Sequence, residues 1–416
     1  MDRRRLVACN KIDDMKKQMV NVLLLAAFAL QAGAEGVKVV VRNTTDDQRH
    51  EVVEVDLQKL RKKIGKEGPL VVRNKIGQQI LSQVSSDGKL LIDASVRPHS
   101  ATTYEVSVGK PLAMKPFVYG RRVPERKDDM AWENDRCAYR LYGPALQKTG
   151  EKSYGIDVWV KNTPELEIDK RYAMDIPGFE ETQRLRSEGL TEKADSNHLA
   201  TSFHIDHGTG YDPYAVGATL GCGAPALMIG DSIVMPYCYA DYKILDNGPL
   251  RFTVALTYEP KEVNGNKRVV EHRMISLDKG SNFNRMTVWY TGLRRPADFA
   301  AGCVIHEADT TTLRLGADYV QYADPTDQID VNNSQLYIGL LFPYGVDKTC
   351  RLNYAHPWGG NTGHALGVRR NLKDGERITY YFGAAWSRYD VRTQREWQLR
   401  IDETLRNLRH PLLVEW

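Results

Sequence analysis

Short runs of alternating apolar and polar residues recur along most of the chain, and this pattern constrains the fold more than any other feature. Near the start, the runs cover residues 37–42, 51–57, 70–73, 79–84, 89–92 and 103–108. Alternation with a period of two is typical of strands with one buried face. Short strands that follow one another so closely predict a small β-sandwich of the immunoglobulin-like kind over residues 35–110.

The remainder of the chain shows the same pattern with longer gaps. Its strand-like runs cover residues 136–141, 156–160, 250–258, 269–277, 284–290, 335–341 and 377–386. Helical patterns are fewer, at residues 180–193 and 393–408, and the second places Trp397, Ile401, Leu405 and Leu408 on one face. Three prolines and many charges mark a junction. We therefore expect a linker at 111–130 and one large, mainly antiparallel β-domain at 131–416.

The N-terminal residues have the features of an export signal. Lys16 and Lys17 precede the apolar residues 20–30, and Ala32-Gly33-Ala34 fits a small-residue cleavage site. The apolar stretch is shorter than the about 20 residues that a membrane-spanning helix needs. We predict a signal peptide over residues 1–34, an exported protein in the periplasm or outside the cell, and no membrane span.

Charge and cysteine content limit the classes of partner. The formal net charge is +4, and residues 1–34 contain six basic and three acidic side chains, so the remaining chain carries +1. This balance gives no reason to expect nucleic-acid binding. Five cysteines follow the signal at wide spacing and without a Cys-x-x-Cys pair, so most of them are expected to be buried thiols.

The densest group of chemically active residues is the sequence His204-Ile205-Asp206-His207-Gly208-Thr209-Gly210, followed by Tyr211. Imidazole, carboxylate and phenol groups transfer protons and bind metals. An extended chain would place His204 and Asp206 on one face, where they could orient a base or hold a cation. A turn at Gly208 would instead bring His207 and Tyr211 together. A structural role for histidines in a polar loop is the alternative.

Two further segments are candidates for ligand binding. Residues 133–136 place polar side chains at the entrance of a strand, where Arg136 could clamp a carboxylate, unless the segment is an exposed charged turn. Residues 356–361, with Trp358 and the following His364, form a polar and aromatic loop that suits a groove wall or an ordinary surface loop. His306 lies in a strand-like run, which favours a structural role.

Several catalytic templates are missing from the sequence. It has no Gly-x-Ser-x-Gly and no His-Glu-x-x-His motif. The glycine-rich residues 217–225 lack the lysine and the setting of a phosphate loop, so we expect a tightly packed β-bend there. The paired carboxylates of glycoside hydrolases have no fixed sequence spacing, so the sequence does not exclude a glycoside hydrolase.

A set of motifs in the large domain resembles a known family. The motifs are Glu133-Asn134-Asp135-Arg136, Tyr142-Gly143-Pro144-Ala145, Gly155-Ile156-Asp157-Val158-Trp159, His207-Gly208-x-Gly210, Leu220-Gly221-Cys222-Gly223, Asn247-Gly248-Pro249, Ile275-Ser276-Leu277-Asp278 and Gly383-Ala384-Ala385-Trp386-Ser387. In this order they resemble the secreted bacterial proteins grouped as domain of unknown function 4861. The resemblance implies an antiparallel β-supersandwich similar to galactose-mutarotase-like proteins and several polysaccharide lyases. Genes of this family are typically found with polysaccharide-degradation genes, so the resemblance also implies a role in polysaccharide degradation.

The resemblance further implies a lyase or dehydratase that acts on uronate-containing oligosaccharides or polysaccharides. Such an enzyme removes a proton next to the uronate carboxylate and must stabilise the resulting negative charge. The implied substrate-binding residues are Asn134, Arg136 and Lys161. Trp358 is a further predicted substrate contact, on the basis of the polar and aromatic loop described above. Either Arg136 or Lys161 would neutralise the carboxylate.

The catalytic roles implied by the same resemblance fall in the histidine loop. His207 would be the base and Tyr211 would donate a proton to the departing oxygen, while His204 or Asp206 would orient the base. No cofactor is required by this chemistry, although a divalent cation held by Asp206 and His204 could take over the neutralisation. A glycoside hydrolase or epimerase on the same scaffold, and a non-catalytic glycan-binding protein, are the alternatives.

Overall fold

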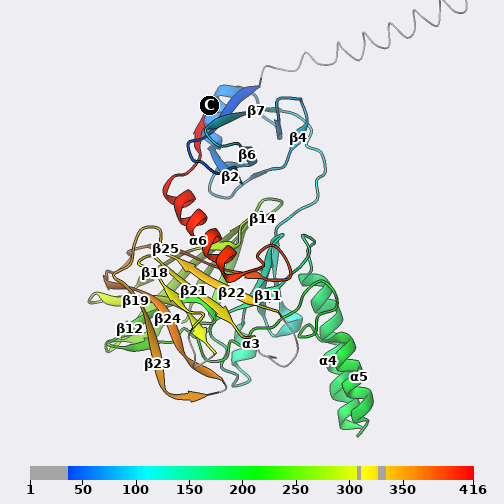
Figure 1. The fold of residues 1–416 in the computed structure, drawn as a ribbon, viewed down its shortest axis with the longest axis vertical. Helices are drawn as coiled ribbons and strands as arrows, with labels where there is room; N and C mark the ends of the chain where they lie inside the picture. Colours follow the sequence, from blue (N-terminus) through cyan, green and yellow to red (C-terminus); the bar gives the residue numbers. More distant parts are fainter. Residues whose placement is uncertain (1–35, 307–310, 327–333, 359) are drawn as a thin grey trace, which may run out of the picture.

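The structure is a computed structural model that describes residues 36–306, 311–326, 334–358 and 360–416, and the predicted signal peptide lies outside them. It confirms a mainly β protein built from antiparallel sheets. Figure 1 shows a small domain, blue at the N-terminal end of the chain, next to a larger one. None of the described helices is long and apolar enough to cross a lipid bilayer.

The small domain consists of two facing sheets. Its elements are β1 (Val37–Asn43), β2 (Arg49–Asp56), α2 (Leu57–Ile64), β3 (Leu70–Arg73), β4 (Gln79–Ile80), β5 (Ser82–Val84), β6 (Lys89–Val96) and β7 (Ser100–Val108). Sheet β26-β1-β7-β3-β4 packs on sheet β2-β6-β5, with Val41, Ile92 and Val106 in the core. The strand-like runs predicted here form strands, because alternation marks one buried face, except that residues 79–84 divide into β4 and β5 of different sheets.

The chain ends in the small domain. Strand β26 (Leu413–Glu415) pairs with β1, with Val414 opposite Val41, and Leu412 lies in the same core. The sequence pattern places these residues in the large domain, residues 131–416, because nothing local marks a return to the first sheet. Residues far apart in the chain therefore close the small domain, as Figure 1 shows in red and blue.

The large domain contains most of the strands. Its elements are β8 (Tyr119–Val123), η1 (Pro124–Arg126), β9 (Asp129–Glu133), β10 (Cys137–Leu141), α3 (Pro144–Gln147), β11 (Ile156–Val160), α4 (Ile168–Ser187), α5 (Thr191–Thr201), β12 (Cys222–Ile229), β13 (Ser232–Val234), β14 (Tyr239–Gly248), β15 (Arg251–Tyr258), β16 (Lys261–Val263), β17 (Asn266–Asp278), β18 (Phe283–Thr291), β19 (Ala297–Ile305), β20 (Arg314–Leu315), β21 (Tyr319–Asp324), β22 (Leu336–Leu341), β23 (Lys348–Trp358), β24 (Asn361–Leu372), β25 (Ile378–Trp386) and α6 (Gln394–Arg409). Strand β8 and part of β9 lie within the predicted linker 111–130, where charged side chains on an edge strand hide the alternation.

Three sheets form the large sandwich. One layer is the nine-stranded sheet β14-β15-β17-β18-β25-β22-β21-β20, with β16 paired to β17. The facing layer contains β11-β10-β9-β8 and β13-β12-β19-β24-β23. These two sheets meet where Ile156 bridges to Gly221. Gly221 has φ 58°, and a Cβ there would collide with the carbonyl oxygen of Ile156, so the glycine-rich segment forms the expected close-packed bend.

Helices contact both layers of the sandwich. The face of α6 with Trp397, Ile401 and Leu405 is buried on the nine-stranded sheet, and Thr393 caps its first turn. This helix matches the prediction for 393–408. The other predicted helix, 180–193, spans a break between α4 and α5, where Gly189 has φ 75°. The start of α4 packs on the four-stranded sheet through Ile168 and Tyr172, and the rest of the α4–α5 pair extends away from the domain (Figure 1).

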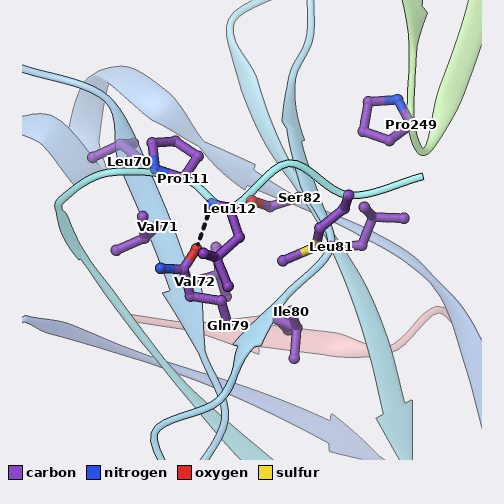
Figure 2. Close-up of a pocket in the computed structure, with 11 residues that line it drawn as sticks. Leu70, Val71, Val72, Gln79, Ile80, Leu81, Ser82, Pro111, Leu112 and Pro249 are labelled. Carbon is purple, nitrogen blue, oxygen red and sulfur yellow. Dashed lines mark hydrogen bonds between the residues drawn. The ribbon is translucent and has the colours of Figure 1, made fainter. Parts of the chain in front are cut away.

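The two domains contact each other through apolar and charged groups. Leu81 and Leu91 pack on Leu250 of the large domain, and Nη1 of Arg251 is 2.6 Å from Oε1 of Glu54. Figure 2 shows a cavity beside this contact, lined mainly by apolar residues of β3, β4 and the segment that leaves the small domain. Its lining offers packing surface and no cluster of catalytic groups.

Candidate functional site at one end of the sandwich

Several strands of the two facing layers begin or end at the same end of the large sandwich. Asp324 is opposite Leu336, which is opposite Trp386, while Ile305 is opposite Gly363 in the facing layer. The segment 211–215 crosses this end, since the rings of Tyr211 and Trp386 are 5.9 Å apart. We call the following group the sandwich-end site: Tyr211, Tyr214, His306, Asp324, Tyr354, His364, Trp386 and Arg388.

His306 joins the two layers at this site. Its Nδ1 is 2.6 Å from Oδ2 of Asp324, and its Nε2 is 2.8 Å from the carbonyl oxygen of Ala215. A carboxylate and a backbone carbonyl only accept hydrogen bonds, so both ring nitrogens donate and the ring is an imidazolium. Because the His306 side chain is 9% exposed and Asp324 is fully buried, the charges compensate each other away from solvent.

His364 lies next to this charged pair and is neutral. It is fully buried, and burial together with the charge of His306 lowers its pKa to about 3. The backbone N–H of Leu220 donates to Nε2 over 3.1 Å. The hydroxyl oxygen of Tyr354 is 3.0 Å from Nδ1. The site thus holds two adjacent imidazoles in opposite protonation states.

The predicted histidine loop turns instead of running extended. Gly208 and Gly210 have φ 97° and 95°, and their N–H groups donate to Oδ1 of Asp206 over 2.8 and 3.0 Å. The other carboxylate oxygen of Asp206 is 3.4 Å from Nη1 of Arg388. Asp206 therefore shapes the turn and faces Arg388 of the sandwich-end site.

The other three predicted catalytic residues occupy different surroundings. Nδ1 of His204 is 3.1 Å from the carbonyl oxygen of Asp212, and Nε2 of His207 is 3.0 Å from that of Ser202. Tyr211 is 2% exposed and packs on Trp386. The turn thus directs Tyr211 inward, while His204 stays half-exposed and His207 exposed.

A buried ionic cluster lies behind His204 and was missed from the sequence. Arg140 contacts Asp212 at 2.9 Å, Asp157 at 2.6 Å and Asp129 at 3.5 Å. Burial raises the pKa of Asp212 to about 7, with repulsion from Asp157, and burial raises that of Asp129 to about 6. The sequence did carry a signal for this cluster, because Arg140 and Asp157 are charged residues inside strand-like runs. In the structure they are opposite each other on β10 and β11.

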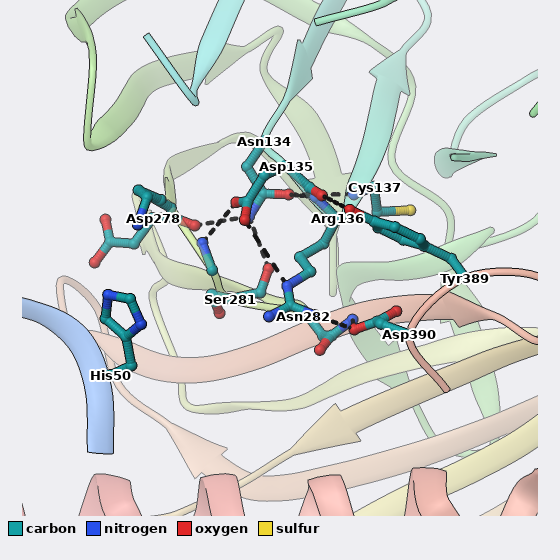
Figure 3. Close-up of polar contacts among 12 residues, drawn as sticks. His50, Asn134, Asp135, Arg136, Cys137, Asp278, Ser281, Asn282, Tyr389 and Asp390 are labelled. Carbon is teal, nitrogen blue, oxygen red and sulfur yellow. Dashed lines mark hydrogen bonds and ion pairs between the residues drawn. The ribbon is translucent and has the colours of Figure 1, made fainter. Parts of the chain in front are cut away.

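The predicted substrate-binding residue Asn134 is engaged inside the protein, as Figure 3 shows. Its amide nitrogen donates to the carbonyl oxygens of Asp278 and Ser281, each at 2.7 Å. Its side-chain oxygen accepts from the N–H groups of Arg136 and Cys137. Asn134 is fully buried, so it ties two turns together and is not accessible to a substrate.

Arg136 and Lys161 are also held by protein partners. The guanidinium of Arg136 pairs with Asp390 (Figure 3). Nζ of Lys161 is 2.6 Å from Glu133 and 2.7 Å from the carbonyl oxygen of Asn134, and both side chains of the ion pair are completely buried. The prediction that Lys161 neutralises a substrate carboxylate is therefore wrong, because its ammonium group has no access to solvent. Lys161 forms a structural ion pair with Glu133 instead.

Trp358 ends β23, and its backbone is opposite Asn361 in the turn to β24. Its side chain lies outside the described part of the structure. The backbone position nevertheless places this predicted contact residue at the end of the sandwich where β24 begins.

A divalent cation at Asp206 and His204 does not fit the geometry. Asp206 uses one oxygen for two backbone N–H groups, and Nδ1 of His204 is engaged with the carbonyl oxygen of Asp212. Within the described ranges, His, Cys, Asp and Glu side chains form no group of three or more suited to a metal ion.

Arg388 is a functional candidate that the sequence analysis missed. Its side chain is 40% exposed, its guanidinium lies 5.3 Å from the ring centre of Trp386, and its Nε donates to Oγ of Ser334 over 2.7 Å. It directly follows the motif that ends at Ser387, which was the available signal. A solvent-accessible guanidinium supported by an aromatic ring can bind an anionic group.

The fold and the site define a class: a two-domain antiparallel β protein with a histidine-containing site at one end of its large sandwich. The chain belongs to the family described as domain of unknown function DUF4861, whose model matches residues 41–414. The resemblance predicted from the motifs is thereby confirmed. A curated relative, "Uncharacterized protein P7" of Formosa agariphila, is 29% identical over 339 residues, covering 78% of this chain and 77% of the relative.

Two solved structures are similar to this chain at 8% sequence identity. An alpha-mannosidase from Enterococcus faecalis V583 has a TM-score of 0.47 over 91% of this chain and 45% of its own. A protein in the glycosyl hydrolase family 38 from Enterococcus faecalis has a TM-score of 0.48 over 91% and 47%. The chain thus spans less than half the length of both solved proteins.

Proposed function

We propose that this protein is a carbohydrate-active enzyme that acts on uronate-containing oligosaccharides by elimination, as a lyase or dehydratase. One observation carries the proposal: the exposed guanidinium of Arg388 is held by Trp386 and Ser334 at the sandwich-end site and lies 3.4 Å from Asp206, the residue before His207. A cationic group beside an imidazole is an arrangement that suits removal of a proton next to a carboxylate. The family resemblance supplies the substrate class.

Elimination from a uronate requires a group that stabilises negative charge on the carboxylate. Arg388 suits this role, because it is exposed at the site and is held in place by Trp386 and Ser334. In this proposal Arg388 takes the role first considered for Arg136 and Lys161.

A base must also remove the carbon-bound proton. His207 keeps this role in the proposal, since Nε2 is engaged with Ser202 and Nδ1 can accept a proton. His204 is the alternative base, with Nδ1 engaged and Nε2 available for the proton. We further propose that the enzyme is exported, as residues 1–34 suggest, and meets its sugar outside the cytoplasm.

The test is an activity screen of the purified protein on uronate-containing oligosaccharides, followed by ultraviolet absorbance and mass spectrometry. Elimination produces an absorbing double bond, with loss of water or a shorter sugar. Arg388→Gln should abolish turnover, whereas the matched control Arg395→Gln, an exposed arginine on α6, should leave it unchanged.

Other results of the screen would replace the proposal. Products that gain water without a new double bond would identify a glycoside hydrolase. Binding without any chemical change would favour the glycan-binding alternative. Turnover that is unaffected by Arg388→Gln would remove this residue from the site.

A further inference from the structure

We propose that Cys222 and Cys303 form a disulfide bond when the protein folds in an oxidising compartment. The two residues lie on β12 and β19, which are neighbouring strands in one sheet of the large sandwich. The inference goes beyond the proposed elimination and does not depend on it. Of the earlier proposals it uses only the export of the protein, because disulfides persist in oxidising compartments.

Strand pairing singles out these two cysteines. The five cysteines that follow the predicted signal peptide are free thiols in the structure. Cys222 is directly opposite Cys303 in the antiparallel pair of β12 and β19. Cys137 and Cys350 are each opposite an apolar residue, and Cys238 precedes β14. Among the described residues, the strand register thus brings one pair of cysteines together.

The pair occupies the kind of position where opposite side chains approach each other most closely. The backbone N–H of Val304 donates to the carbonyl oxygen of Gly221 over 2.9 Å. This bond joins the residue after Cys303 to the residue before Cys222. The two cysteines are therefore a non-hydrogen-bonded pair, with Cα atoms about 4.5 Å apart and both side chains on one face of the sheet. A disulfide bond spans Cα separations of about 4.4–6.8 Å, so the two strands can accept one with little movement.

Both side chains lie in the interior of the sandwich. Cys222 and Cys303 are fully buried in its core, and Sγ of Cys222 is 4.0 Å from the carbonyl oxygen of Gly383 in the facing layer. Burial raises the pKa of both thiols, so neither forms a thiolate at neutral pH in the folded protein. The bond must therefore form during folding, before the facing layer covers β12 and β19.

The chemical step is thiol–disulfide exchange with an oxidant that itself carries a disulfide. The thiolate of one cysteine attacks a sulfur atom of the oxidant, which forms a mixed disulfide and releases one oxidant thiolate. The thiolate of the second cysteine then attacks the chain sulfur of the mixed disulfide, which forms the S–S bond and releases the other oxidant thiolate. The chain loses two protons and two electrons, and the oxidant is reduced to its dithiol.

The bond links the two strand ends that lead into the sandwich-end site. Cys303 is followed by Val304, Ile305 and His306, while Cys222 follows the bend in which the N–H of Leu220 donates to His364 over 3.1 Å. The bond closes a loop of about 80 residues, which strongly restricts the unfolded chain. We therefore expect it to stabilise the protein against thermal unfolding.

The first experiment refolds the denatured and reduced full chain with a mixture of oxidised and reduced glutathione. Circular dichroism identifies the folded fraction, its free thiols are alkylated in denaturant, and its peptides are mapped by mass spectrometry without reduction. We expect a bond between Cys222 and Cys303, whereas Cys137, Cys238 and Cys350 are alkylated or capped by glutathione. Alkylation of both Cys222 and Cys303 in the folded fraction would overturn the inference.

Thermal denaturation measures the effect of the bond. Wild-type protein refolded with the oxidant should have a Tm at least about 4 °C above that of wild-type protein refolded with a reductant. The double variant Cys222→Ala and Cys303→Ala should show no such difference. The matched control Cys350→Ala, at a partly exposed cysteine on β23, should keep it. Equal Tm values for the two wild-type preparations would contradict the stabilising role.

The same peptide mapping of the full chain, recovered from the envelope of a bacterial host, separates this inference from the earlier proposals. A bonded pair in that fraction supports both the disulfide and the export. Protein retained in the cytoplasm would refute the proposed export, and the refolding experiment would still decide the disulfide. A protein that turns over no uronate sugar would refute the proposed elimination and leave the bond between Cys222 and Cys303 unaffected.

Discussion

Replacing Asp212 with Asn removes one charge from the buried cluster around Arg140 while preserving the shape of the side chain. Asp212 is fully buried and accepts from Arg140 over 2.9 Å and from the N–H of Tyr214 over 3.3 Å. The amide oxygen of Asn can still accept from the N–H of Tyr214, whereas its NH2 group would face the guanidinium of Arg140 and cannot accept from it. The variant therefore removes both the ionisation of this group and its hydrogen bond to Arg140.

The direction of the pH effect follows from the raised pKa. Burial and repulsion from Asp157 raise the pKa of Asp212 from 3.8 to about 7. The folded state binds this proton more tightly than the unfolded chain. The resulting stabilisation is therefore full below the pKa of Asp212 in the unfolded chain, and it is lost as the pH rises through the pKa in the folded state. A change of this size corresponds to about 4 kcal/mol of stability between about pH 4 and about pH 8.

Asp212→Asn lacks this dependence but loses the hydrogen bond to Arg140, which costs about 0.5–1.5 kcal/mol while Asp212 is protonated. We expect the variant to be less stable than the wild type in acid and to equal or exceed it above neutral pH. Urea denaturation at both pH values measures the difference, and Asp231→Asn, an exposed turn residue, is the control. A stability difference that stays constant with pH would refute the reasoning.

Three further predictions concern stability and are measured by urea denaturation of each variant. Lys161→Met should lower the free energy of unfolding by about 3–5 kcal/mol, because Glu133 would stay buried without its cation; a neutral result would mean that this carboxylate is protonated. Trp397→Ala should cost about 3–5 kcal/mol by opening a cavity under α6, and a loss below about 1 kcal/mol would show that the helix collapses onto the sheet. Gly221→Ala should cost at least about 1 kcal/mol, because a Cβ at φ 58° would also collide with the carbonyl oxygen of Ile156, whereas Gly230→Ala, in open space at the same φ, should cost less.

Sequence periodicity correctly predicted the strands and helices whose formation depends mainly on neighbouring residues in the chain. The alternating runs of the small domain became strands, and the apolar face of residues 393–408 became the buried face of α6. Both follow from the side-chain periods of strand and helix, which are properties of the local backbone. The edge strand β8 was missed because an edge strand tolerates charges on both faces.

The candidate site could be predicted only in part for a related reason. The sequence brought Asp206 and Tyr211 to attention because they stand close together in the chain. It gave His306 a structural role, and its ion pair with Asp324 depends on two strands from different sheets. Arg136 and Lys161 looked available in the sequence, whereas the fold surrounds them with Asp390 and Glu133.

The sequence by itself determined a mainly antiparallel β protein, its family, and the loop in which chemically active residues concentrate, because each of these depends on residue type and short spacing. The tertiary structure alone decided which charges are buried in pairs, that β26 returns to the first sheet, and that His306, His364 and Tyr354 meet at one end of the sandwich. Burial and proximity between distant residues set protonation and access to solvent, and the chain order records neither.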